Sequence, residues 1–141
     1  MIKWLAFVIT AAVLTGCGSS GSGPEREAVH GRVSLDGQDV AQGSIVFTPT
    51  GGTKGMVTGG TIKDGKYELS ADRGPVVGTN RVEIRSVRKT GRKVPAPMGA
   101  PGEMVDQSVE GIPAWYNTQS TLKVEIKSGE DNEQNFELKS R

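Results

Sequence analysis

Residues 61–69 read TIKDGKYEL, and this stretch predicts the β-hairpin from which the fold class follows. Its two-residue link, Asp64-Gly65, has alternating apolar and polar residues on both sides. A type I′ turn needs positive φ at both central positions, and Asp-Gly is one of the pairs that adopt it most readily. We therefore expect one strand over residues 56–62 and the next over residues 66–70.

Five further stretches show the period-2 alternation that is typical of half-buried strands. They cover residues 29–35, 45–47, 79–87, 122–126 and 136–138. No stretch after residue 27 has the strong 3.6-residue period of an amphipathic helix. Short strands separated by turns therefore predict an all-β protein, built as an antiparallel seven-stranded β-sandwich.

The segment 88–113 interrupts this regularity. It contains Pro95, Pro97, Pro101 and Pro113 together with four glycines, which disfavour both a central strand and a helix. We expect a connection of about 25 residues without regular structure, a length that is usually either functional or disordered.

Several turn and core residues resemble those of carboxypeptidase regulatory-like domains, the transthyretin-like sandwiches of many bacterial surface proteins. The resemblance begins with the alternating residues 29–35, the turn Asp36-Gly37 and the strand at 45–47. Residues 64–69 resemble the same family's Asp-x-Gly-x-aromatic-x-Leu hairpin, shifted by one residue, and the later segment 112–116 resembles the entry to a late strand. The resemblance spans residues 28–139 and implies a transthyretin-like fold. Asn80 departs from it, because such domains often carry Tyr there.

The N-terminal residues are typical of a bacterial lipoprotein signal. Lys3 and the apolar run 4–14 precede Leu14-Thr15-Gly16-Cys17, and the run is too short to span a bilayer. The Cys17 thiol would carry a diacylglyceryl group, and cleavage between Gly16 and Cys17 would leave Cys17 as a new N-terminus available for a third acyl chain. Two or three acyl chains anchor a protein stably. An ordinary secretory signal and an uncleaved anchor are the alternatives.

This interpretation divides the chain into three parts. We expect a signal peptide over 1–16, the lipidated Cys17 with a flexible Gly/Ser linker over 17–27, and one domain over 28–141. The domain would lie outside the cytoplasm, anchored to the cell membrane or the outer membrane. Cys17 is the only cysteine, so lipidation also accounts for an otherwise odd exported thiol.

Composition and charge disfavour several function classes. Without Lys3, 16 Lys and Arg face 16 Asp and Glu, and this neutral balance argues against nucleic acid as a partner. His30 is the only histidine, so neither a catalytic triad nor a zinc site is expected. We therefore predict no catalytic residues, no cofactor and no metal, and a monomer.

Two surface features are candidates for recognition. Basic residues concentrate along the fifth strand and the following segment at Arg81, Arg85, Arg88 and Lys89, continued by Arg92 and Lys93. They suit an anionic polysaccharide, a lipid head group or an acidic protein. Trp115 lies beside Tyr116, and on a strand a buried Tyr116 would turn Trp115 outward to stack on a sugar or a partner.

The function expected from these features is a non-catalytic, lipid-anchored binding or scaffolding module of the cell envelope. One alternative is a polysaccharide-binding accessory module that serves a separate envelope enzyme. Another is a small hydrolase that uses Glu103, Asp106 and Glu110 as acid and base.

The lipidation hypothesis predicts a clear result for Cys17→Ala. Without the thiol there is no atom to carry the diacylglyceryl group, so incorporation of labelled fatty acid should be abolished and the leader should stay attached. Ser19→Ala, two residues along, is the control and should label normally. Continued labelling of the Cys17→Ala protein would contradict the anchoring hypothesis.

Overall fold

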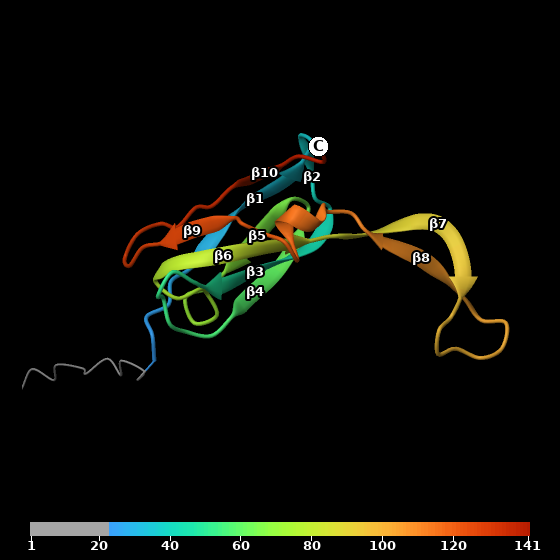
Figure 1. The fold of residues 1–141 in the computed structure, drawn as a ribbon, viewed down its shortest axis with the longest axis horizontal. Coiled ribbons are helices and arrows are strands. Elements are labelled where there is room, and N and C mark those ends of the chain that lie inside the picture. Colours follow the sequence, from blue (N-terminus) through green and yellow to red (C-terminus); the bar gives the residue numbers. More distant parts are fainter. Residues whose placement is uncertain (1–22) are drawn as a thin grey trace, which may run out of the picture.

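The computed structural model describes residues 23–141, and its regular structure is almost entirely β (Figure 1). The elements in chain order are β1 (Val29–Leu35), β2 (Gln38–Asp39), β3 (Gln42–Pro49), β4 (Thr58–Lys63), β5 (Lys66–Leu69), β6 (Gly78–Arg85), β7 (Val87–Pro95), β8 (Met104–Glu110), the 3₁₀ helix η1 (Ala114–Tyr116), β9 (Lys123–Ile126) and β10 (Phe136–Leu138). A membrane-crossing helix, long and apolar throughout, does not occur within residues 23–141.

Most strands belong to one strongly curled sheet. The order across it is β10-β1-β5-β4-β3-β6-β9, and β2 pairs with β1. Neighbouring strands are antiparallel except β1 and β10, which are parallel. The strands β7 and β8 form a separate two-stranded sheet that projects from this body (Figure 1).

The all-β class with antiparallel pairing is confirmed, and a strand forms at each of the seven expected positions. The seven-stranded sandwich is not confirmed, because the hydrogen-bonded path runs through one curled sheet from β10 to β9. Three further strands, β2, β7 and β8, join the seven. The fifth expected strand is also shorter than predicted, since β6 ends at Arg85 and Val87 begins β7.

The turn at Asp64 and Gly65 has the predicted conformation. Their φ angles are +48° and +74°, and Lys63 lies opposite Lys66 across the turn. Both turn amides donate hydrogen bonds to the segment before β3, to the carbonyls of Ala41 and Val40 at 2.8 and 2.9 Å. The local sequence therefore sets the hairpin, and the same turn attaches it to the rest of the sheet.

The core lies inside the curl of the sheet and follows the alternation seen in the sequence. Tyr67 is nearly buried between Phe47 and Phe136, with ring centroids 6.2 and 6.3 Å away. Its hydroxyl donates to the Gln134 carbonyl at 2.7 Å, and burial raises the pKa of Tyr67. The core is thus closed by a hydrogen bond between β5 and the segment that leads into β10.

Asn80, the residue that departs from the resemblance, is fully buried. Its side-chain amide donates to the carbonyls of Val76 and Gly78 at 2.8 and 3.0 Å. These hydrogen bonds tie the loop before β6 to the strand.

The segment 88–113 corrects the expectation of an irregular connection, because most of it forms the hairpin β7–β8. Pro95 lies at the end of β7, where its missing N–H costs little, and Pro97 and Pro101 lie in the tip between the strands. Gly91 has φ +78° within an irregular stretch of the ladder between Lys89 and Lys93. The prolines therefore mark the end and the tip of an ordered hairpin.

Gly31 is the glycine whose replacement should cost most in stability. A Cβ at this position would overlap the backbone carbonyl of Gln134, which is held by the Tyr67 hydroxyl and by its own amide on the His30 carbonyl. We expect Gly31→Ala to lower the free energy of unfolding by about 2–4 kcal/mol in urea denaturation. Gly23→Ala, which meets nothing within 4 Å, should change it by less than about 0.5 kcal/mol. Equal unfolding midpoints for both variants would contradict this account of the Gly31 contact.

Candidate functional site

Arg81 and Arg85 lie together on the outer face of β6, as the alternation predicted, and both pair with the same carboxylate. Glu83 lies between them with its carboxylate 2.5 Å from the Arg81 guanidinium and 3.7 Å from that of Arg85. The part of the predicted basic surface that lies on β6 is therefore an ion-pair network.

The other predicted basic residues, Arg88 and Lys89, lie on β7 in the projecting hairpin. Lys89 and Lys93 each place their ammonium group 2.9 Å from the Asp106 carboxylate on β8. Hydrogen bonds from Lys89 and then Lys93 lower the pKa of Asp106 to about 2. Within residues 23–141 Arg88 and Arg92 have no ion pair, so they are the basic residues of the hairpin whose charge is not matched internally.

Trp115 and Tyr116 lie on η1 and not on a strand, because Pro113 caps a short helical turn. Tyr116 packs partly against the core, and its hydroxyl accepts a hydrogen bond from the Lys139 amide at 3.1 Å. Trp115 is 47% exposed, with its ring centroid 6.1 Å from that of Tyr116. Trp115 faces outward and Tyr116 inward, as predicted, but both lie on the 3₁₀ helix η1 and not on a strand. η1 itself packs near β6.

The three carboxylates of the hydrolase alternative are spread along the hairpin. Glu103 accepts a hydrogen bond from the Ala100 amide at the tip, Asp106 holds the two lysines, and Glu110 accepts from the backbone at the root. Strand residues advance by about 3.4 Å each, so Asp106 and Glu110 are separated by about 14 Å along β8. This exceeds the roughly 5–9.5 Å spacing of paired glycosidase carboxylates.

His30 lies on the outer face of β1, with Nε2 3.5 Å from the Asp131 carboxylate. Within residues 23–141, no group of three or more His, Cys, Asp or Glu is placed to hold a metal ion. The predicted cleavage and lipidation residues, Gly16 and Cys17, lie outside the described residues.

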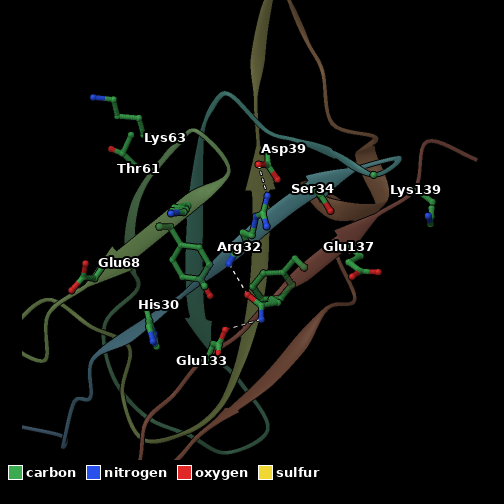
Figure 2. A pocket seen from close by; sticks show the side chains of 16 residues that line it. His30, Arg32, Ser34, Asp39, Thr61, Lys63, Glu68, Glu133, Glu137 and Lys139 are labelled. Carbon is green, nitrogen blue, oxygen red and sulfur yellow. Dashed lines mark hydrogen bonds and ion pairs between the residues drawn. The ribbon is translucent and has the colours of Figure 1, made fainter.

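One groove on the body of the protein was not predicted. It is a groove of about 970 Å³ on the outer face of β10, β1, β5 and β4. Figure 2 shows Arg32 near its centre, Asp39 at one end, and His30 and Glu133 at the other. Thr61 and Lys63 lie on one side, and Glu137 and Lys139 on the opposite side (Figure 2). The volume is at the upper end of the range typical of small-molecule sites.

Three basic residues occupy neighbouring strands along this groove. In the sheet register Arg32 on β1 lies opposite Lys66 on β5, and Lys66 lies opposite Lys63 on β4. Asp39 pairs with Arg32 at 2.6 Å and raises the pKa of that guanidinium, mainly through the hydrogen bond. Lys63 and Lys66 have no ion pair within residues 23–141.

Part of this row could have been found from the sequence. A two-residue Asp64-Gly65 turn necessarily places Lys63 opposite Lys66, so the hairpin signal itself implies a pair of facing lysines. The position of Arg32 beside them depends on the pairing of β1 with β5, which lies between segments more than 30 residues apart. Local patterning carries no information about that pairing.

Comparison of the chain with protein-family models, with curated proteins and with solved structures gave no match.

The Asp106 ion pairs predict that the hairpin opens at acid pH. Because the pKa of Asp106 is depressed, its contribution to the folded hairpin is complete above about pH 4, the ordinary value for Asp, and is lost as the pH falls toward 2. Asp106→Asn should therefore lower the protection of the β7 and β8 amides from hydrogen exchange at neutral pH, relative to the intrinsic rates, and remove the acid dependence of that protection. Asp131→Asn makes the same charge change on the body and is the control. Unchanged hairpin exchange in Asp106→Asn would show that these ion pairs do not hold the strands together.

Proposed function

We propose that this protein is a non-catalytic, lipid-anchored module of the cell envelope that presents the β7–β8 hairpin to a binding partner. The observation that carries the proposal is the position of the hairpin. It projects from one end of the molecule, while the N-terminal end of the described chain, at Gly23, leaves from the other end (Figure 1). A tether at Cys17, six residues before Gly23, would leave the hairpin pointing away from the membrane.

The surface of the hairpin is suited to binding. Met98 at the tip is fully exposed, Val87 at the root is 63% exposed, and Met104 and Val105 on β8 are also exposed. An isolated two-stranded hairpin is marginally stable in water, and exposed apolar side chains along such an element support a role in binding. Confinement near a membrane raises the effective concentration of both partners, so a small contact of this kind is sufficient for function.

The remaining parts of the proposal come from the sequence. The lipoprotein signal supports export and attachment of Cys17 to the cell membrane or the outer membrane, with the domain outside the cytoplasm. The turn and core residues that resemble carboxypeptidase regulatory-like domains support a transthyretin-like sandwich as the fold of this domain. We propose that the module acts as a monomer.

Photo-crosslinking in the membrane tests the role of the hairpin. A photoreactive residue at Met104 of the full-length lipoprotein should give a discrete crosslinked product, and adding Met98→Glu should reduce its yield at least about fivefold by placing a charge in an apolar contact. Met56→Glu provides a matched control, because Met56 is 73% exposed on the body and outside the hairpin. Equal yields with Met98→Glu and Met56→Glu would contradict presentation by the hairpin.

A further inference from the structure

The basic row of the groove, Arg32, Lys66 and Lys63, is arranged to receive an anion. These residues lie on three successive strands, and hydrogen-bonded strands are about 4.8 Å apart, so the row extends over about 10 Å. Their neighbours along the strands, Val33 and Tyr67, are buried, so the basic side chains face away from the core. All three side chains line the groove.

This row also differs from the other basic clusters in the described chain. Arg81 and Arg85 both pair with Glu83, and Lys89 and Lys93 both pair with Asp106, whereas in the groove Asp39 pairs only with Arg32. Like charges directly opposite each other on a sheet are destabilising. In the ligand-free protein the repulsion between Lys63 and Lys66 lowers the stability of the fold, and a bound anion would remove that repulsion.

The other end of the groove has the opposite character. Glu68 on β5 lies opposite His30 on β1 in the sheet register. Glu133, in the segment before β10, pairs with His30 through an isolated backbone β-bridge. Carboxylates accept hydrogen bonds from hydroxyl groups. Tyr67 and Phe136 are nearly buried, so recognition in this groove would depend on polar groups and not on stacking.

We propose that the groove binds an acidic saccharide. Its carboxylate or phosphate group lies on Arg32, Lys66 and Lys63, and its hydroxyls donate to Glu68 and Glu133. An oxyanion between neighbouring cations forms charge-assisted hydrogen bonds, which are about twice as strong as neutral ones. The acidic end repels a uniformly charged polyanion, so a ligand with one anionic group and several hydroxyls fits best. This site is separate from the β7–β8 hairpin and does not require the lipid anchor.

The test is a titration of the ¹⁵N-labelled full chain, in detergent, with four probes. Glucuronic acid represents a sugar carboxylate, glucose 6-phosphate a sugar phosphate, maltotriose a neutral saccharide, and inorganic phosphate an anion without hydroxyls. We expect at least one acidic sugar to shift the amide signals of Gly37 and Gly65 and to bind at least tenfold more tightly than maltotriose and inorganic phosphate. The arm that binds identifies the anionic group. No shift with either acidic sugar overturns the proposal, and equal binding of inorganic phosphate overturns its saccharide part.

Variants separate this site from general charge effects. Lys66→Gln should weaken the acidic sugar at least tenfold and also raise the Tm of the ligand-free protein, because it removes the repulsion with Lys63. Lys54→Gln makes the same charge change in the exposed loop between β3 and β4, outside the groove and opposite no cation of a paired strand, and should alter neither quantity. Equal weakening by both variants, or a lower Tm for Lys66→Gln with undiminished binding, would overturn the assignment of the site. Loss of hairpin crosslinking bears only on the proposed function, so the two proposals fail independently.

Discussion

The close approach of the Gln134 backbone to Gly31 is the contact on which the position of β10 in the curled sheet depends. Gln134 donates its amide to the His30 carbonyl, and its carbonyl accepts from the Tyr67 hydroxyl, so one residue joins β1, β5 and the entry to β10. There is no room for a side chain at Gly31. This contact brings β10 alongside β1 in parallel, covers the core with Phe136 and Leu138, and forms one side of the groove.

The distribution of ion pairs determines which basic residues remain available to bind a ligand. A count of positive charges along the sequence favours β6 and the following segment, where arginines and lysines are most frequent. In the folded chain Glu83 and Asp106 bind those residues internally, and each internal pair reduces the charge that is available to a ligand. The lysines beside the Asp64-Gly65 turn are fewer, yet they are left unpaired within the described chain and lie in a groove.

The projecting hairpin shows how prolines can mislead a prediction. Four prolines in 26 residues indicate an irregular segment when each is read as a strand breaker. Here Pro95 ends a strand, Pro97 and Pro101 shape the tip, and Pro113 begins η1, so all four lie at the boundaries of regular elements. The intervening Val94 pairs with Val105 and Lys93 with Asp106, interactions between residues more than ten positions apart.

The sequence by itself determined the all-β class, the position of every strand with clear alternation, and the turn at Asp64-Gly65, because these depend on local φ preferences and on the period of side chains along a strand. It also carries the whole of the lipidation hypothesis at Cys17. Only the tertiary structure decided that the strands form one curled sheet, that β7 and β8 pair, and that Arg32 joins Lys63 and Lys66 in a groove. Those features depend on which distant segments lie side by side, and that choice is made by the packing of the whole core and not by any local pattern.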